Sequence, residues 1–453
     1  MNVPTQPPQL SDADKILRPV GTKERIDTLD ILRGVALLGI LLMTITKFAL
    51  PDSHFETILR HPESLNYKIA FFNANVFEGK MRAIFSMIFG AGILLFCAKE
   101  TPQRSVTGIF YWRMILLMLF GLMHTHLFLW VGDILFLYGL CGMLLFIFRN
   151  MNPAWLLAAA LCFIVIEISL NSYFYNHNRT QRLAYLEVEN IEKKGAQLTD
   201  EQIKAKEEWK RKEAEYFPDG SKIGKFVTVM RSGYWTIARN LRRQLIASET
   251  THAPFSMVDP LALMFLGMAL FKWGFFSGFL PDRIYVWLLI IGYCIGYPLV
   301  FYSWNILLTA PNIVEFFEAN PYNIRVLIQP LQRMLLGVGH VSLLILILRR
   351  GIFKRLTNML GAVGKMAFSN YIMHTAICTF IFFGYGLGYF GRLKYHELYY
   401  VVIAIWILQL IISHIWFKYF RFGPLEWAWR SLTYWKVQPM RVSRDDEDLQ
   451  TLV

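Results

Sequence analysis

Two histidines and an aspartate lie close together in the apolar stretch GLMHTHLFLWVGDILFLYG, residues 121–139. A polar side chain in a segment that spans lipid is costly, which makes each one a candidate functional group. His124 and His126 are two residues apart and face different sides of a helix. Asp133 follows at a short turn, where its carboxylate could orient a neighbouring imidazole for general-base or nucleophilic catalysis. We expect His124 and Asp133 to be catalytic, and the structural alternative is a hydrogen bond from His124 to a neighbouring helix.

A second group of charges stands at the start of another apolar run, FEGKMRAIFSMIFGAG. Glu78, Lys80 and Arg82 enter this run at its N-terminal end, and Gly79 permits close approach of the backbone. A helix N-terminus with nearby basic groups can bind an anion, and a carboxylate there can serve as a general base. The pattern predicts a catalytic Glu78 with Lys80 and Arg82 binding substrate. The structural alternative is a helix N-terminus whose charged side chains extend to the membrane surface.

The first apolar run opens with RIDTLDILRGVALLG. Asp30 and Arg33 are three residues apart, share a helix face and can pair. Arginine binds phosphate oxygens through two parallel N–H donors, so Arg25 and Arg33, with Asp30, could hold a phosphate-bearing donor. Gly34 favours close approach of a neighbouring helix. The alternative is an ion pair that only anchors the helix at the membrane surface.

Polar residues also occur in apolar segments of the second half of the chain. Pro330 breaks the backbone hydrogen bonding one turn before Arg333, which frees carbonyl groups to line a cavity. A buried arginine requires an acidic partner or a bound anion. We expect Arg333 to bind substrate or to pair with one of three carboxylates, Glu78, Asp133 or Glu167.

The segment GKMAFSNYIMHTAICTF carries two further candidates. Asn370 and His374 are four residues apart and therefore lie on the same face of a helix. Side chains of this kind either connect neighbouring helices by hydrogen bonds or line a binding site. We expect Asn370 and His374 to contribute to substrate or donor binding.

Other site classes find no support in the sequence. The histidines lie on different segments without an HExxH motif or a Cys/His cluster, so no metal site is predicted. A Walker loop and a dinucleotide fingerprint are also absent from the sequence. The five cysteines lie in apolar segments without a CxxC pair, which is typical of buried packing residues. The net charge of +13 comes from basic residues that border apolar segments, so we do not expect a nucleic-acid partner.

The elements that position these residues are predicted from the distribution of apolar residues. Apolar residues make up 55% of the chain and charged residues only 17%, too few to cover a soluble globule. Runs of about 20 apolar residues, enough to cross a ~30 Å hydrocarbon core, recur along the chain. The expected fold is an all-α polytopic bundle of about ten spans in a lipid bilayer. The predicted spans are 31–50, 83–98, 112–130, 132–148, 154–172, 259–278, 284–304, 327–348, 361–384 and 398–417.

The orientation follows from the basic residues in alternate short connections. Placing these residues and the basic N-terminal and C-terminal tails in the cytoplasm requires an even number of spans. We expect a multi-pass protein of the bacterial plasma (inner) membrane with both termini in the cytoplasm. The first 24 residues are polar and the first apolar run is too long for a signal-peptide core, so no cleaved signal is expected. Four basic residues of the first external loop depart from the rule: Arg60, Lys68, Lys80 and Arg82.

The predicted domain organisation is a cytoplasmic tail, two membrane halves of about five spans separated by a charged external loop, and a second tail. The loop contains EVENIEKKGAQLTDEQIKAKEEWKRKEAEYFPDG, whose composition favours surface helices. It is predicted to be either a solvated hairpin or a lid or partner-docking element. Residues 224–246 have the pattern of an interfacial amphipathic helix. The predicted boundaries are 1–24, 25–172, 173–255, 256–435 and 436–453.

Several of these strings together resemble one family. LDILRGVALLGILL, FEGKMRAIFSMIFGAGILLF, GLMHTHLFLWVGDILFLYGLCG, GKMAFSNYIMHTAICTFIFFGYGLGYFG and FRFGPLEWAWRSLTYWK occur in an order that resembles the YeiB-like family of bacterial inner-membrane proteins of uncharacterised function. The resemblance covers nearly the whole chain apart from the charged loop. The run from Gly364 to Trp435 is its most specific part.

The string LDILRGVA, Leu29 to Ala36, is similar to one in transmembrane acyltransferases, including those that acetylate sugars from a coenzyme A donor. The similarity implies acyl transfer from acetyl-CoA or another acyl donor to an envelope glycan or a small hydroxyl- or amine-bearing acceptor. Arg33 would hold the donor and an intramembrane histidine would remove a proton. Those acyltransferases commonly carry His or Asn about eleven residues after the arginine, where this chain has Thr44. The competing hypotheses are a transporter for a small anionic solute, with Arg333 and Lys80 as charge partners, and a noncatalytic scaffold.

Overall fold

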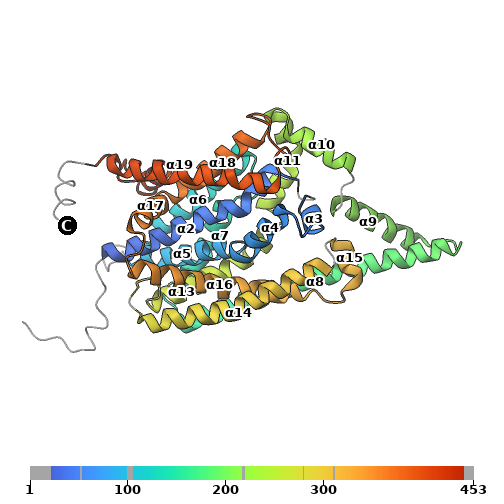
Figure 1. Cartoon of the computed structure of the whole chain (residues 1–453), viewed down its shortest axis with the longest axis horizontal. Helices are drawn as coiled ribbons and strands as arrows, with labels where there is room; N and C mark the ends of the chain where they lie inside the picture. The colour runs from blue at the N-terminus through green and yellow to red at the C-terminus, as the bar shows by residue number, and fades with distance from the viewer. Residues whose placement is uncertain are drawn as a thin grey trace, which may run out of the picture.

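The computed structural model describes residues 22–51, 54–98, 106–216, 220–278, 280–309 and 312–442. Within these ranges the chain is built from helices, with one isolated β-bridge between Phe420 and Arg441 and no longer strand. The helices form an elongated bundle with a hairpin that projects from one end (Figure 1). The expectation of an all-α fold is confirmed.

Eight helical segments of the described chain are long and apolar enough to cross a membrane, and two shorter apolar helices lie among them. Each of the ten predicted spans overlaps one of these ten segments, so the protein is a multi-pass membrane protein. The two short helices are α7 (Leu135–Leu145), which continues into the 3₁₀ turn Phe146–Phe148, and α18 (Ala367–Phe382). The main helices of the eight long segments are α2 (Thr22–Ala49), α5 (Lys80–Cys97), α6 (Thr107–Phe128), α8 (Pro153–Lys193), α13 (Val258–Lys272), α14 (Asp282–Thr309), α16 (Ile324–Arg349) and α19 (Leu398–Tyr419). The segments of α5, α13 and α19 each also include the short helix that precedes the main one, and begin at Leu65, Ala253 and Tyr395.

Several predicted boundaries differ from the observed ones. The predicted span 361–384 is divided at Met366 between α17 (Lys354–Lys365) and α18. The predicted span 83–98 corresponds to a longer observed segment, Leu65–Cys97, because α4 (Leu65–Val76) leads into α5 through a short turn. The remaining elements are α3 (His54–Leu59), α9 (Asp200–Tyr216), α10 (Gly220–Met230), α11 (Tyr234–Glu249), α12 (Ala253–Ser256), α15 (Ile313–Ala319), the 3₁₀ turn Tyr395–Glu397 and α20 (Pro424–Tyr434).

The centre of the bundle is the contact between α5 and α13, one helix from each half of the chain. Gly90 of α5 lies against the backbone of Met264, and Gly267 of α13 lies against the backbone of Met87. Small residues at such positions let two helices approach closely enough for dense van der Waals packing. Nearly every residue of α13 is buried as a result. The two predicted halves therefore share one core rather than forming separate bundles.

A second close crossing joins α2 to α17. A Cβ atom on Gly34 would overlap the carbonyl oxygen of Leu360, and one on Gly364 would overlap the carbonyl oxygen of Asp30. The glycine of the LDILRG string thus has a packing function, as its expected role in close helix approach predicts. This crossing fixes the end of α2 that lies opposite the hairpin (Figure 1).

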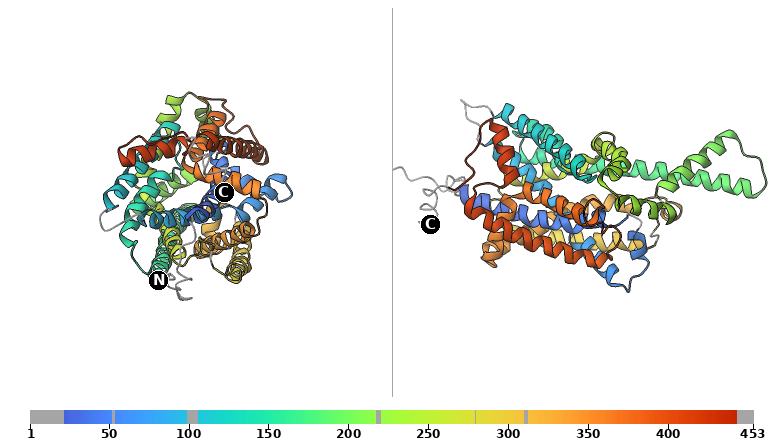
Figure 2. Two further views of the ribbon diagram at one scale, coloured as in Figure 1. Left: turned by 90° about the vertical axis from the view of Figure 1, so that its left-hand side faces the viewer. Right: turned by 90° about the horizontal axis from the view of Figure 1, so that it is seen from above.

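The charged loop forms the projecting hairpin, which consists of the C-terminal part of α8 and of α9 (Figure 2). Trp209 of α9 is fully buried in a small cluster with Tyr175 of α8 and Phe317 of α15. After the hairpin, the predicted amphipathic helix over residues 224–246 is two helices, α10 and α11, that are interrupted at residues 231–233. Ile237, Leu241 and Leu245 of α11 are buried against the bundle, so its apolar face covers protein.

Candidate functional site

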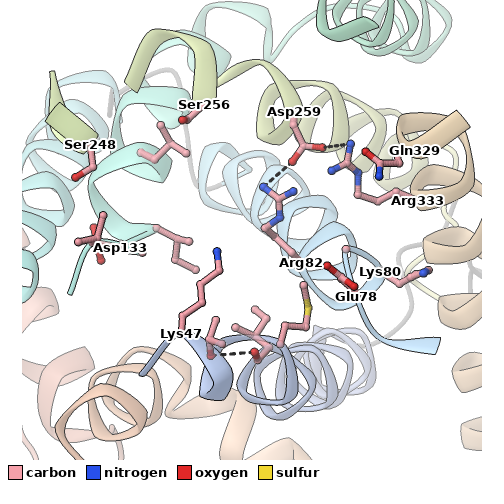
Figure 3. A pocket seen from close by; sticks show the side chains of 18 of the residues that line it. Lys47, Glu78, Lys80, Arg82, Asp133, Ser248, Ser256, Asp259, Gln329 and Arg333 are labelled. Atoms are coloured by element: carbon pink, nitrogen blue, oxygen red, sulfur yellow. Dashed lines mark hydrogen bonds and ion pairs between the residues drawn. The ribbon is translucent and has the colours of Figure 1, made fainter. Parts of the chain in front are cut away.

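A cavity of about 830 Å³ lies at the end of the bundle where α2 ends and where α5 and α13 begin. Side chains from both halves of the chain and from the segment after the hairpin line it (Figure 3). A cavity of this size can hold a small organic molecule. Its charged and imidazole lining residues are Lys47, Glu78, Lys80, Arg82, Asp133, Glu167, Glu249, His252, Asp259, Arg325, Arg333 and His374.

His124 and Asp133 form a close pair beside this cavity. The Nδ1 atom of His124 lies 2.7 Å from Oδ1 of Asp133. The other carboxylate oxygen accepts a hydrogen bond of 2.8 Å from the backbone N–H of Phe136, in the first turn of α7. The Nε2 atom of His124 is buried and has no hydrogen-bond partner among the described residues. Asp133 lines the cavity and His124 does not, so the carboxylate is the member of the pair that a ligand can contact.

Arg333 lies in the centre of an ion-pair network that connects four helices. Its Nη2 atom is 2.7 Å from Glu167 of α8 and 2.9 Å from Asp259 of α13. The second oxygen of Asp259 is 2.8 Å from Arg82 of α5. The requirement of Arg333 for an acidic partner is therefore met, and Glu167 was one of the three predicted carboxylates. Asp259 was not predicted, and its only sequence signal is a single carboxylate at the start of a predicted span.

The turn between α4 and α5 divides its three charged residues between different environments. Gly79 adopts φ 76°, a conformation that glycine tolerates best, and so permits the sharp turn. Lys80 is almost fully buried and its Nζ donates a hydrogen bond of 2.6 Å to the carbonyl of Ala74. Glu78 lines the cavity without an ion pair or hydrogen bond to any described residue. Of the three predicted residues here, Glu78 is thus a free carboxylate and Arg82 is paired.

Asn370 and His374 of α18 have different surroundings although they share a helix face. Asn370 donates hydrogen bonds to the carbonyl of Val363 at 3.1 Å and to Ser413 at 3.0 Å, and it is not part of the cavity wall. His374 lines the cavity, and its Nε2 atom is 2.6 Å from the side-chain oxygen of Gln409 in α19. Asn370 therefore connects helices, whereas His374 both connects helices and borders the cavity.

The Asp30 and Arg33 pair lies toward the opposite end of α2. The two side chains are 2.6 Å apart, as their spacing predicted, and neither lines the cavity. The Arg33 side chain is 30% exposed, so it can be reached from the surface. The side chain of Arg25 falls outside the described residues. Thr44, which is at the position where acyltransferases commonly have His or Asn, does line the cavity.

Several lining residues were not predicted from the sequence. Lys47 points into the cavity from the last turn of α2 (Figure 3) and has no ion-pair partner among the described residues. Arg325 of α16 donates a hydrogen bond of 3.2 Å to Ser303 of α14. Glu249 and His252 come from the segment after the hairpin, whose position over the cavity depends on tertiary packing. Within the described chain, no group of three or more His, Cys, Asp or Glu residues is arranged to hold a metal ion.

Comparison with known proteins connects this site to two family descriptions. Residues 270–436 match the family described as "Protein of unknown function (DUF418)". Residues 25–195 match the family described as "Heparan-alpha-glucosaminide N-acetyltransferase, catalytic". The first region contains Arg333 and His374, and the second contains Asp133 and Glu167, so the cavity draws on both.

Similar proteins cover almost the whole chain. "Uncharacterized protein YeiB" of Escherichia coli (strain K12) shares 29% identity over 90% of this chain and 96% of its own length. The chain is similar to the YeiB-like proteins over nearly its whole length. "Uncharacterized protein YxaH" of Bacillus subtilis (strain 168) shares 25% identity over 94% of this chain and 98% of its own length. "Uncharacterized 39.9 kDa protein in amylase 3'region" of Bacillus acidopullulyticus shares 25% identity over 94% of this chain and 99% of its own length. No solved structure matches the chain.

The similarity to these proteins agrees with the resemblance seen in the sequence, and the structure gives parts of that resemblance a physical role. The GPLEW string of the YeiB-like C-terminal region places Glu426 at the start of α18. Its carboxylate accepts hydrogen bonds from the backbone N–H groups of Phe368 at 2.7 Å and Ser369 at 3.0 Å. Caps of this kind satisfy donors that a helix leaves free at its first turn. The string thus fixes the helix that carries His374.

Proposed function

We propose that this YeiB-like protein is a membrane acyltransferase of the bacterial plasma membrane, with both termini in the cytoplasm. It transfers an acyl group from acetyl-CoA or another acyl thioester to a hydroxyl or amine of an envelope glycan or a small acceptor. The single observation that carries the proposal is the Asp133–His124 pair at the wall of a polar cavity, inside the region that matches an N-acetyltransferase catalytic family.

Asp133 is the proposed catalytic residue because its carboxylate borders the cavity. In the reaction the acceptor O–H or N–H adds to the thioester carbonyl, and the C–S bond breaks as the C–O or C–N bond forms. The acceptor proton passes to Asp133, and a proton returns to the departing thiolate. His124 acts through Asp133 as a positioning residue, since its Nδ1 atom is 2.7 Å from the carboxylate and its ring does not reach the cavity. General-base assistance of this kind is worth about 10²- to 10⁴-fold in rate.

Glu78, Lys47 and His374 are the proposed contacts for the acceptor. Glu78 and Lys47 line the cavity and have no ion-pair partner among the described residues, so both are available to a ligand. His374 borders the same space from α18. Arg333 and Arg82 are proposed to shape the cavity through Glu167 and Asp259, because their charges are already paired.

The alternative of an anion transporter has less support. It requires Arg333 and Lys80 as free charges for a solute. Arg333 is paired with two carboxylates, so it does not offer the uncompensated charge that an anionic solute would need. Lys80 lines the cavity, but its ammonium donates to the carbonyl of Ala74.

The test is acyl transfer by the purified protein in proteoliposomes. Radiolabelled acetyl-CoA is supplied together with an envelope fraction as the acceptor, and protein-dependent label in the acceptor is measured. We expect transfer by the wild-type protein and its loss in D133N. Absence of transfer, together with absence of accumulated acyl groups in overexpressing cells, would contradict the proposal. Uptake of an anionic solute that requires no acyl donor would favour the transporter instead.

A further inference from the structure

Three arginines from distant parts of the sequence converge at the end of the bundle opposite the cavity. Arg33 is on α2, Arg113 on α6 and Arg430 on α20. The Arg113 guanidinium lies 3.7 Å from the ring centroid of Trp429, the neighbour of Arg430 on α20, and the charges of Arg430 and Arg33 both act on it. Like charges repel, so such a cluster is unfavourable unless an anion or carboxylates compensate it.

The carboxylates near this cluster are already engaged. Asp30 pairs with Arg33 at 2.6 Å, and Asp27 lies 3.2 Å from Lys365. Glu426 is one turn before Arg430 on α20, the usual spacing for an ion pair. Its carboxylate instead accepts hydrogen bonds from the backbone and hydroxyl of Ser369, at 3.0 Å and 2.5 Å.

Arg113 and Arg430 consequently lack carboxylate partners among the described residues. The Arg113 guanidinium stacks 3.7 Å from the ring centroid of Trp429, and Arg430 lies 5.0 Å from that of Phe422. The Nε atom of Arg430 is buried and has no hydrogen-bond partner in the described part of the chain. Cation–π contacts orient a guanidinium but leave its N–H donors free for an anion.

The packing of α20 against α6 holds these two arginines in place. The indole N–H of Trp429 donates to the carbonyl of Arg113 at 3.0 Å, and the indole N–H of Trp112 donates to the carbonyl of Leu432 at 3.1 Å. Trp112 also stacks on Trp435, with ring centroids 5.4 Å apart. Both arginines are half-buried within this interface, unlike basic side chains that only extend toward lipid headgroups.

We propose that Arg33, Arg113 and Arg430 form a phosphate-binding site. Arginine guanidinium groups bind phosphate oxygens through paired N–H donors, and three of them match a phosphate ester or diphosphate. If the protein is an acyltransferase as proposed, the phosphate bound here belongs to an acyl donor of the coenzyme A type. The identity of this ligand rests on the proposed function. Ile40 lines the cavity seven residues after Arg33, so about 10 Å of helix separates the arginines from the cavity.

The experiment measures binding to the full-length protein in phosphatidylcholine nanodiscs. The probes are coenzyme A, inorganic phosphate and pantetheine, which lacks the phosphate groups of coenzyme A. We expect R113Q and R430Q each to weaken coenzyme A binding by about tenfold or more, and R430K to weaken it less, because lysine keeps the charge but not the paired N–H donors. Pantetheine binding should not change. R239Q is the matched control, because Arg239 is exposed on α11 at the other end of the bundle.

Folding is checked by size-exclusion chromatography and circular dichroism, and R430Q provides the test if R113Q does not fold. Unchanged binding of coenzyme A and phosphate in folded R113Q and R430Q would overturn the site. A second set of nanodiscs contains phosphatidylglycerol. If this lipid competes with coenzyme A in the wild type but not in R430Q, the phosphate site stands and lipid headgroups share it.

The binding experiment and the acyl-transfer experiment can fail independently. Coenzyme A binding that depends on Arg113 and Arg430, without acyl transfer, would support the site and contradict the acyltransferase. Acyl transfer whose KM for acetyl-CoA is the same in R430Q and the wild type would overturn the site and leave the acyltransferase in place.

Discussion

The imidazole of His124 and the carboxylate of Asp133 are joined at 2.7 Å across the turn between α6 and α7. A Cβ atom on Gly121, one turn before His124, would overlap the backbone of Phe136 in α7 and the carboxylate of Asp133. The absence of a side chain there lets α7 pack closely on α6. The short turn brings the two residues near each other, and the close packing of α7 on α6 holds their side chains in contact.

The first prediction concerns the Asp133 carboxylate. D133N preserves the shape of the side chain but cannot accept the acceptor proton. We expect kcat/KM for acyl transfer to fall by about a hundredfold or more, measured with labelled acetyl-CoA in proteoliposomes. D200N, in the exposed first turn of α9, should retain wild-type activity.

H124Q tests the positioning role of the histidine. If His124 acts through Asp133, kcat falls while KM stays near its wild-type value, and the pH dependence of kcat changes shape. Activity of D133N equal to that of the wild type would rule out both roles.

The second prediction concerns the ion-pair network around Asp259. D259A removes one partner from Arg82, whose side chain is 33% exposed, and from the mostly buried Arg333, which retains only Glu167. We expect a loss of about 3–5 kcal/mol in unfolding free energy, the range for breaking a buried ion pair. The measurement is unfolding of the detergent-solubilised protein.

The double variant R82M/D259A separates charge from shape. It removes Arg82 together with its partner and leaves the Arg333–Glu167 pair intact, so it is expected to restore part of the lost stability. A double variant less stable than D259A would show that Arg82 contributes mainly through packing.

The third prediction concerns the crossing of α2 and α17. G364A places a methyl group against the carbonyl oxygen of Asp30, so the two helices must separate. We expect a loss of about 1–3 kcal/mol in unfolding free energy, typical of an overpacked contact. G92A is the control, since Gly92 lies in α5 with nothing within 4 Å of the added Cβ atom. Equal stability of the two variants would contradict the close crossing.

The fourth prediction concerns the cap of α18. E426A removes the acceptor for the N–H groups of Phe368 and Ser369, which should cost about 0.5–2 kcal/mol. Hydrogen exchange followed by mass spectrometry should show faster exchange in the first turn of α18 and unchanged exchange in α13. Uniform acceleration across both helices would indicate global destabilisation instead of a local cap.

The fifth prediction concerns orientation. In a variant without the five native cysteines, A196C in the turn of the hairpin should react with a membrane-impermeant maleimide in intact cells. K354C, at the start of α17, should react only after permeabilisation. The reverse labelling pattern would place the cavity on the cytoplasmic side.

The sequence alone determined the class of fold and the number of apolar segments. Segments of about 20 apolar residues have few alternatives to helices that span a membrane, because every backbone polar group must be satisfied within lipid. Local spacing also determined the Asp30–Arg33 pair, since three residues on a helix bring two side chains onto one face. The His124–Asp133 pair was predictable for a similar reason, as a short turn limits how far its flanking residues can separate.

Only the tertiary structure decided which distant residues share the cavity. Asp259 joins Arg82 and Arg333 because α5, α13 and α16 pack together, and no local pattern records that arrangement. The same holds for Lys47 and Glu249, which reach the cavity from α2 and α11. Asn370 and His374 share a face and both bond to α19, yet only His374 also borders the cavity. Helix periodicity specifies a direction around one axis, and the packing of the other helices determines what lies in that direction.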